Sequence, residues 1–525
     1  MSLDEFLHNL HFNTEKIRPP DWEVDWEDAP LPYKLYRGLP VFPLSLEVPL
    51  TLEGQETPVK PDLRGIGDLL WYVYGITQLS QSASSSGAAA PDGLMQSFRR
   101  FVPSGGALYP NELYVYLKAE DLPHGVYHYD AAHHRLILLR EGNYDSYLAQ
   151  ALGNRCDVSA CFGTIFVSTV FWKNFFKYHN FAYRLQGLDA GALIGQLLEV
   201  AKRFRFESGV CFQFLDRALN HLLGLAGQEE SVYAVIPLSA EPSSTWFADR
   251  KVQGVMASSE KLCQELTAVP HENYDRSDRV AEYPMIIKMN EASMMESTGS
   301  FQRIEKKKRV NGEGQWVALP HVERLSYDLA SVCRKRYSLD TDFILRKVSQ
   351  QKLAALLKEA TDSFAYRNDL DEAHEGSQYR VSLYGCMYGV EGIQNGAFCY
   401  DAENHRLRKI NAGDYRSAMQ QGSAGHNVNL FQVPLCLHVA GEMNFLKTSL
   451  GYRGYRIQQM EAGMLVQRLL LTASALGMGG HPLLGFEPGM CDELYKMKPQ
   501  GKTSLIQVPV GHYHPRPWLK GMLHS

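Results

Sequence analysis

The chain has 525 residues, which allows two to four domains of ordinary size. With 45% hydrophobic and 21% charged residues, it has the composition of a well-packed globular protein. The formal net charge of −5 gives no electrostatic basis for nucleic-acid binding, and no apolar run reaches the ~18 residues of a membrane span. The nine cysteines are scattered without a C-x-x-C pair, and the N-terminus carries acids where a signal peptide needs bases. We therefore expect a cytoplasmic protein that binds neither nucleic acid nor membrane.

The first half of the chain mixes helical and strand patterns. Residues 1–60 are rich in proline, tryptophan and acid, which predicts an extended arm lying on other parts of the protein. The elements expected after the arm are a helix over 65–77, a mobile loop over 80–93, strands over 112–119 and 164–171 with a hairpin between them, a long helix over 185–205 and a strand over 231–238. This order of elements predicts an α+β domain.

Two segments of the first half recur in the second. GVYHYDAAHHRL at 125–136 returns as GAFCYDAENHRL at 396–407, and YRLQGLDAG at 183–191 returns as YRIQQMEAG at 455–463. Both pairs are displaced by nearly the same distance, which far exceeds the roughly 20–50 residues of a solenoid repeat. The sequence therefore predicts two similar domains in tandem.

The repeat sets the expected domain boundaries. We expect the arm at 1–60, a first domain at 61–255, a polar and irregular connection at 256–325 and a second domain at 326–525. The basic run at 306–309 falls in the connection and is interpreted as a solvated stretch. In the second domain, a helix over 457–477 that ends at a glycine and a strand over 504–510 match elements of the first.

The sharpest motif is RRFVPSGGALYPNELYVYL at 99–117. Glycines just before a strand leave backbone N–H groups unshielded, so a flat ligand can approach them closely. On PSGG alone, a tight turn that enters a strand is the alternative reading.

The motif belongs to a longer pattern that includes LLWYVYGIT (69–77), KYHNFAYR (177–184) and GLDAGALIGQLL (187–198). In order and spacing this pattern closely resembles the SagB-type, or McbC-like, dehydrogenases, the FMN-dependent branch of the nitroreductase superfamily. The second half resembles the same fold more faintly, through SVCRKRYSLDTDF (331–343) and GMGGHPLLGF (477–486). The resemblance implies an α+β fold of two tandem nitroreductase-like domains that pair as an intramolecular pseudo-dimer, with FMN in the groove between them.

In this family one domain supplies an arginine-serine segment for the phosphate, and the other supplies a PSxG-type loop along the flavin ring. The resemblance assigns flavin contacts to Pro103, Ser104, Gly105, Gly106 and Leu108, phosphate contacts to Arg334, Arg336 and Ser338, and further cofactor contacts to Gly479, Gly480 and Arg516. Arginine donors and a hydroxyl suit a phosphate, although RKRYS also fits an exposed basic helix start.

The two halves carry complementary parts of this site. The first half has no clear arginine-serine segment. In the second half the segment that aligns with PSGG has the sequence DEAHEGSQYRVSLYG, which contains no comparable glycine loop. One groove alone then has a full set of parts. We therefore expect a single FMN per chain.

Lys177 and Tyr178 match the lysine–tyrosine pair that these dehydrogenases use for catalysis. The resemblance implies oxidation of a thiazoline or oxazoline ring to the azole, for which a base removes a proton and hydride passes to the flavin. Adjacency to a cation is expected to lower the pKa of the tyrosine. The second copy has Ser449 and Leu450 at these positions. The alternative is an ordinary surface lysine beside a half-buried tyrosine.

Other polar positions are interpreted as structural. Tyr183-Arg184 and Tyr455-Arg456 persist in both copies, which favours a role in tying the helix start to a strand. Asp189 and Glu461 are read as caps in the first turns of their helices. The paired histidines His133-His134 and His512/His514 lack further ligands at metal spacing, so no metal site is predicted.

The leading hypothesis is an FMN-dependent dehydrogenase acting on a modified peptide or a related small heterocycle. A general nitroreductase acting on a small molecule, or a non-catalytic scaffold subunit of a peptide-maturation complex, are the alternatives. Other enzymes of a peptide-modification cluster are candidate partners. The pattern leaves the substrate, the electron acceptor and the choice between a monomeric pseudo-dimer and a homodimer open.

Overall fold

The computed structural model describes residues 1–53, 60–83, 94–242, 246–247, 256–304, 314–362, 366–371, 380–425 and 427–515. Arg516, the basic run at 306–309 and residues 84–93 of the predicted loop lie outside this range.

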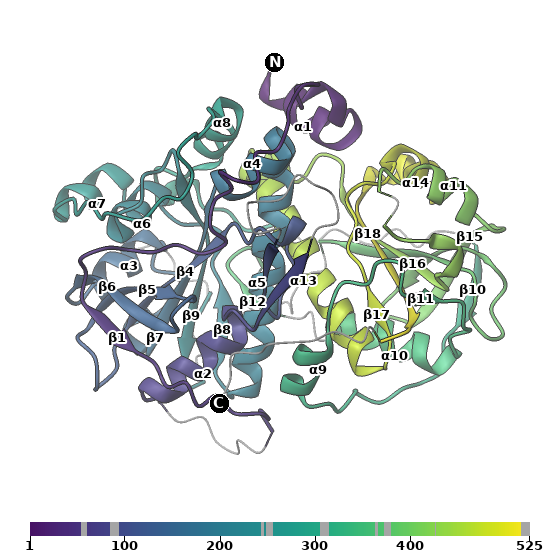
Figure 1. The fold of residues 1–525 in the computed structure, drawn as a ribbon, viewed down its shortest axis with the longest axis horizontal. Helices are drawn as coiled ribbons and strands as arrows, with labels where there is room; N and C mark the ends of the chain where they lie inside the picture. The colour runs from purple at the N-terminus through teal and green to yellow at the C-terminus, as the bar shows by residue number, and fades with distance from the viewer. Residues whose placement is uncertain are drawn as a thin grey trace.

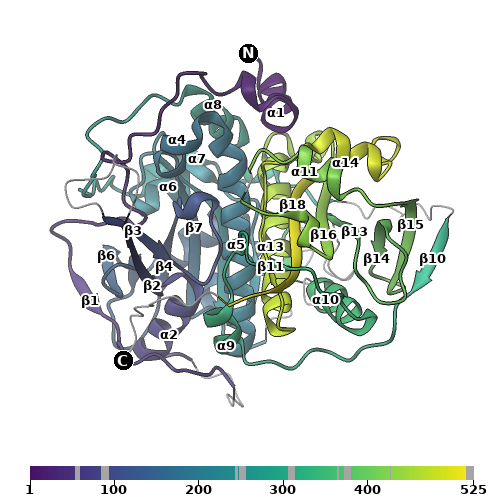
Figure 2. The same ribbon diagram turned by 45° about the vertical axis from the view of Figure 1, so that its right-hand side comes forward.

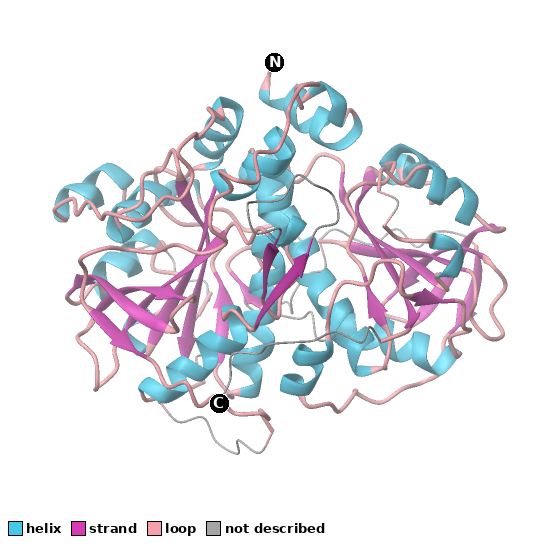
Figure 3. Ribbon diagram, viewed as in Figure 1, coloured by secondary structure: helices cyan, strands magenta, loops and turns pink. Residues whose placement is uncertain are grey.

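Two β-sheets, one for each half, lie on either side of a central pair of long helices (Figures 1 and 3). The central helices are α5 (Ala182–Arg203) and α13 (Arg453–Ala475), which run side by side through the molecule (Figure 2). A continuous apolar core extends from the first sheet through both helices to the second sheet. The predicted tandem of two α+β halves is confirmed.

The first sheet contains all the strands predicted for the first half. In spatial order it consists of β1 (Val41–Pro43), β6 (Arg135–Glu141), β5 (Gly125–Asp130), β4 (Asn111–Leu117), β7 (Gly163–Val170), β9 (Glu230–Ser239), β8 (Glu207–Val210) and β12 (Arg367–Asn368). Neighbours are antiparallel except β8 and β12, which are parallel. Because β12 comes from the second half, the chain crosses between the halves at this edge.

The second sheet repeats the order of the first six strands of the first sheet. It consists of β10 (Gln315–Ala318), β15 (Arg406–Ala412), β14 (Gly396–Asp401), β13 (Ser382–Met387), β16 (Leu435–Glu442), β18 (Lys502–Tyr513) and β11 (Phe343–Ile344), with β17 (Gly479–Gly480) also paired to β18. β2 (Gln78–Ala83) and β3 (Leu94–Arg99) form a separate two-stranded ribbon, and the end of β2 covers the first residues of the stretch predicted as a loop.

Shorter helices cover the sheets and carry site residues. In chain order they are α2 (Leu63–Tyr74), α3 (Asp145–Ala151), α4 (Trp172–Tyr178), α6 (Asp216–Leu223), α9 (Leu329–Lys335), α10 (Gln350–Asp362), α11 (Arg416–Gln421), α12 (Lys447–Leu450) and α14 (Pro488–Leu494). The outer faces of the two sheets pack into separate apolar clusters with α3 and α6 in the first half and with α11 and α14 in the second.

The arm and the connection hold more structure than the sequence predicted. The arm begins with helix α1 (Leu3–Phe12), where Ser2 and Glu5 form a capping box. The connection contains α7 (Ser259–Glu265), α8 (Pro284–Ser293) and strand β10 of the second sheet. Both segments bury apolar side chains whose burial the local sequence pattern does not predict. Their conformation therefore depends on packing against distant parts of the chain.

Glycines let α5 and α13 approach each other closely. A Cβ added at Gly191 would lie 2.0 Å from the carbonyl oxygen of Met460, and one at Gly463 would lie 2.1 Å from the carbonyl oxygen of Leu188. No side chain larger than hydrogen fits at either crossing point. The two halves are therefore fixed against one another at backbone contact.

The repeated Tyr-Arg pairs reinforce this interface. Tyr183 and Tyr455 stack with ring centroids 5.9 Å apart. Arg184 donates to the carbonyl oxygen of Leu505 in the second half, and Arg456 donates to the carboxylate of Asp216 in the first. The contacts support a structural role in which each arginine reaches across to the other half. Arg184 ties the start of α5 to strand β18 as predicted, whereas Arg456 contacts helix α6 and not a strand.

Candidate active site between the two halves

The PSGG segment forms a loop with an unusual backbone. Gly106, Ala107 and Tyr109 all have positive φ, at 66°, 57° and 48°. Only glycine adopts this conformation freely, so the two other residues store strain, which is typical of functional loops. The Arg100 backbone N–H donates to the Tyr109 hydroxyl at 3.0 Å and closes the loop at its base.

Asp189 of α5 anchors the same loop from below. The Ser104 hydroxyl donates to Asp189 Oδ2 at 2.6 Å, and the Gly105 N–H lies 3.2 Å from each carboxylate oxygen. Burial raises the pKa of Asp189 to about 7, although both hydrogen bonds oppose the rise. Because α5 begins at Ala182, the expectation that Asp189 caps a first helical turn is wrong.

Lys177 and Tyr178 converge on the loop from α4. A Cβ added at Gly106 would lie 3.0 Å from Lys177 Nζ and 2.6 Å from Tyr178 Oη. The helix ends directly after the pair at His179, which has a left-handed φ of 50°. In the second copy Gly451 occupies the matching position with a φ of 57°. The structure thus brings the predicted catalytic pair and the predicted flavin loop together.

The two side chains differ in their acid–base behaviour. Burial lowers the pKa of the Lys177 ammonium, which favours a neutral amine. Burial raises the pKa of Tyr178 to about 12, with a further rise from the charge of Asp189. The expectation that the neighbouring lysine lowers the tyrosine pKa is therefore wrong. Lys177 is the candidate base, and Tyr178 stays protonated as a hydrogen-bond donor.

Alanine at Gly106 is expected to disrupt the site. It would force an L side chain into a left-handed conformation, at a cost of roughly 1–2 kcal/mol, and push against both Lys177 and Tyr178. The G106A variant should show a lower melting temperature and weaker flavin binding. The matched control is G451A, at a left-handed glycine of the second half whose added Cβ would meet nothing within 4 Å, so it should lower the melting temperature and spare flavin binding. Equal losses of flavin binding in both variants would contradict this account.

A narrow pocket within the second half lies beside the C-terminal end of α9. Arg336 follows α9, and its Nε donates to the carbonyl oxygen of Phe101 at 2.8 Å. Its Nη1 is buried without a hydrogen-bond partner. The pocket is lined by Lys335, Arg336, Tyr337, Leu339, Leu470, Ser474, Met478, Gly479, Gly480 and Tyr513. An unpartnered buried guanidinium N–H is costly unless a ligand accepts from it.

A second arginine, from the first half, reaches the same region. The Arg99 guanidinium lies 5.7 Å from the Tyr337 ring centroid. Burial and the nearby Arg99 lower the pKa of Arg336 to about 9. Among the described residues, neither arginine forms an ion pair with a carboxylate. A buried guanidinium group (Arg336) and a half-buried one (Arg99) of like charge suit an anion such as a phosphate.

The structure distributes the other predicted cofactor residues unevenly. Ser338 forms a β-bridge with Gly480, which lines the pocket with Arg336, but Ser338 itself does not line the pocket. Arg334 instead donates to the carbonyl oxygen of Leu50 at 2.7 Å and does not line the pocket. Arg516 lies outside the described residues. Pro103 and Leu108 flank the loop and are half-buried.

Two site residues were missed by sequence reasoning. Arg99 opens the RRFVPSGG run and was not assigned, although it was the charged residue nearest the loop besides Arg100. Asp189 was read as a cap. Its counterpart Glu461 keeps an acid at the matching position, and this retention was the available signal for a shared role under the loop.

The pseudo-equivalent groove is built differently. Glu461 lies well inside α13, so the first-turn cap is wrong here too. It accepts hydrogen bonds from Arg380 Nε at 2.9 Å and from the Tyr366 hydroxyl at 2.6 Å, and Arg380 also pairs with Asp371. A buried ion-pair network therefore stands where Asp189 holds a glycine loop in the first groove. Ser449 replaces the lysine in α12.

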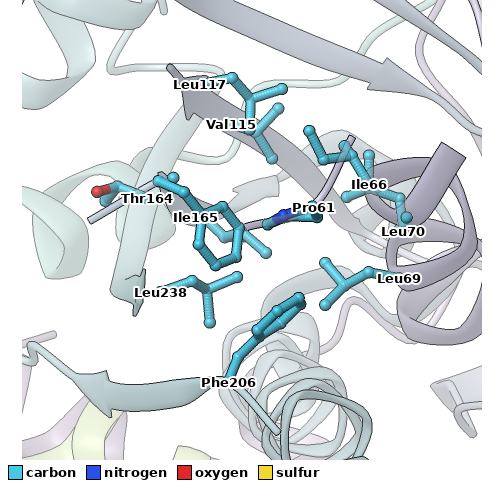
Figure 4. Close-up of a pocket in the computed structure, with 13 residues that line it drawn as sticks. Pro61, Ile66, Leu69, Leu70, Val115, Leu117, Thr164, Ile165, Phe206 and Leu238 are labelled. Atoms are coloured by element: carbon cyan, nitrogen blue, oxygen red, sulfur yellow. The ribbon is translucent and has the colours of Figure 1, made fainter. Parts of the chain in front are cut away.

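Another pocket lies away from this chemistry, inside the first half. It is an apolar space between α2 and the first sheet, with side chains such as Ile66, Leu69, Val115 and Phe206 around it (Figure 4).

The described part of the chain holds no group of three or more His, Cys, Asp or Glu side chains placed to bind a metal ion. None of the described helices combines the length and apolar character that crossing a membrane requires.

Comparison with known proteins gives matches to both halves. The model of the nitroreductase family matches residues 78–238 and 343–512. A protein of Methanocaldococcus jannaschii, provisionally named a nitroreductase, is 24% identical over 210 residues, covering 38% of this chain and 98% of that protein. The oxygen-insensitive NAD(P)H nitroreductase of Enterobacter cloacae is 42% identical over 48 residues, covering 9% of this chain and 22% of that protein. The crystal structure of a provisionally named nitroreductase of Anabaena variabilis aligns with 98% of this chain and 99% of its own, with a TM-score of 0.71 and 21% identity.

Proposed function

Because the chain belongs to the nitroreductase family, we propose that it is an FMN-dependent dehydrogenase of the SagB type that oxidises an azoline ring to an azole. The substrate would be a modified peptide or a related small heterocycle. The convergence of Lys177 and Tyr178 on the left-handed Gly106 is the observation that carries this proposal.

The residues between the halves suit FMN. Arg336, with its unpartnered N–H, and Arg99 would hold the phosphate, and Ser338 would contribute a hydroxyl beside them. The glycines at 105 and 106 leave the loop open to a flat ring. When bound, FMN would supply the acceptor for a hydride from the β-carbon of the azoline.

The protein groups would handle the proton. Conversion of an azoline to an azole removes one proton and one hydride, so the ring loses two electrons. Lys177 in its neutral form would take the proton from the α-carbon, and burial supports that form by lowering its pKa. Tyr178, protonated because its pKa is raised to about 12, would donate a hydrogen bond to the substrate. The loop held by Asp189 would fix the distance between the substrate and this pair.

A direct test uses the purified full-length chain and a small thiazoline carboxamide. Mixing the two under anaerobic conditions should bleach the yellow flavin absorption, and mass spectrometry should detect the thiazole, which has two hydrogens fewer. A flavin-free protein would support the scaffold alternative and refute the proposal.

The cofactor content is a separate expected result. One FMN should be released per chain on denaturation, because Arg336 contacts the segment that carries the glycine loop in one groove, while Arg380 and Glu461 fill the matching place in the other. Chromatography of the released flavin against protein concentration measures the ratio. A ratio near two, or release of FAD, would contradict this prediction.

A nicotinamide-dependent nitroreductase is the second candidate function. The family match and the local identity to the Enterobacter cloacae enzyme support it. The two candidates differ in the reductant, because a nitroreductase accepts electrons from NAD(P)H and needs no base. Rapid bleaching by NADPH together with no reaction towards the thiazoline would favour this second function.

A further inference from the structure

Trp26 of the N-terminal arm lies beside the candidate catalytic pair. Its ring centroid is 5.2 Å from Lys177 Nζ, and its ring meets Phe176 edge-on at 5.4 Å. The arm passes over α4 at this point (Figure 1). The residue nevertheless keeps 49% of its surface exposed. A large aromatic ring is thus presented to solvent next to the group that would remove the proton.

The backbone on either side of Trp26 is held in place. Asp25 pairs with Arg279, and Asp28 accepts from the backbone N–H groups of Asp278 and Arg279. Earlier in the arm, the Trp22 indole donates to the carbonyl oxygen of Phe176 at 3.2 Å. These contacts fix the arm to both α4 and the connection. The segment that carries the ring is therefore already ordered, so a ligand that binds there does not have to meet the entropic cost of ordering it.

The arm also lies outside the family segments, which begin at residue 78. Trp26 therefore lies outside the segments that the family model matches. An exposed aromatic face beside a base offers stacking to a flat, unsaturated ring and much less to a puckered one. Such a surface suits a planar heterocycle.

We propose that Trp26 is a ligand-binding residue of this site, and that it favours a flat five-membered ring, the aromatic azole product above all, over a puckered one by stacking on the ring held against Lys177 and Tyr178. This inference rests on the proposed function. It adds a specificity determinant that comes from the arm.

The test measures binding to the flavin-loaded full chain by ligand-observed NMR titration. The probes are 2-methylthiazole-4-carboxamide, which is planar, and 2-methylthiazolidine-4-carboxamide, whose ring is puckered. The W26A variant should raise the dissociation constant of the thiazole roughly three- to tenfold, and W26F should restore most of the affinity. The thiazolidine constant should change less than twofold. The control Y274A removes another exposed aromatic ring, which contacts Arg37, and should change neither constant.

Equal losses for both probes in W26A, an unchanged thiazole constant, or no thiazole binding by the wild type would overturn the inference. The flavin spectrum of the same samples separates this result from the proposed function. A yellow protein without ring discrimination refutes the role of Trp26 alone. A colourless protein that still prefers the thiazole through Trp26 refutes the FMN enzyme and keeps the planar-ring site.

Discussion

Replacing Lys177 with alanine will slow thiazoline oxidation roughly 10²–10⁴-fold and leave FMN bound, because the variant lacks the base but keeps the flavin loop. The K177R variant should be equally slow, since a guanidinium keeps its proton at working pH. Single-turnover bleaching of the flavin by the thiazoline carboxamide measures the rate. The matched control is S449A, which alters the pseudo-equivalent position in α12 and should oxidise the probe at the wild-type rate.

The pH dependence gives a second readout for Lys177. Only the neutral amine accepts a proton, so the wild-type rate should rise with pH and level off once the amine has lost its proton. Burial lowers the pKa of Lys177, so the plateau should come at a lower pH than an exposed lysine would give. The rise should vanish in K177A. A wild-type rate in that variant, or an unchanged pH profile, would show that Lys177 is not the base.

Replacing Arg336 with alanine will weaken FMN binding about 10- to 100-fold, because a charge-assisted hydrogen bond to a phosphate is worth ~1.5–3 kcal/mol. The structure provides the reason in the buried Nη1 that lacks a partner. Equilibrium dialysis of the apoprotein with FMN measures the constant. The R336K variant should fall between the wild type and alanine, since lysine keeps the charge and loses the planar fork.

Two controls make this result specific to the phosphate. Riboflavin has no phosphate, so its affinity should be nearly the same in R336A and the wild type. R334A tests the neighbouring arginine, whose guanidinium is bound to the Leu50 carbonyl, and should change FMN binding less than about threefold. If R336A weakened FMN and riboflavin equally, Arg336 would act by supporting the loop through Phe101 and not by binding phosphate.

The two copies of the fold in this chain build unequal grooves. A pair of identical halves would build two equal sites. Here Asp189 holds a strained glycine loop in one groove, while Glu461 is engaged by Arg380 and Tyr366 in the other. The second half keeps the scaffold and contributes Arg336 to the groove of the first.

Local pattern was enough to place most regular elements. Strands β4, β5, β6, β7 and β9 of the first sheet and the helices α2, α5 and α13 agree with their predicted positions to within a few residues, whereas β1, β8 and β12 were not predicted. Strand alternation and helical spacing are patterns of residues close together in the chain, so they can be recognised in the sequence alone. The tandem repeat can be recognised in the same way. The helix in the arm and the two helices of the connection cannot, because their burial depends on surfaces supplied by distant parts of the chain.

The sequence by itself determined the two halves, the glycine loop and the position of Lys177-Tyr178 before the long helix. Only the tertiary structure decided which groups meet. It joined Asp189 to Ser104, brought Arg99 of one half to Arg336 of the other, turned Arg334 away, and set Trp26 beside Lys177. These contacts follow from the close crossing of α5 and α13 and from the docking of the arm. Such long-range packing depends on the whole core and leaves no periodic trace in the sequence around any one of these residues.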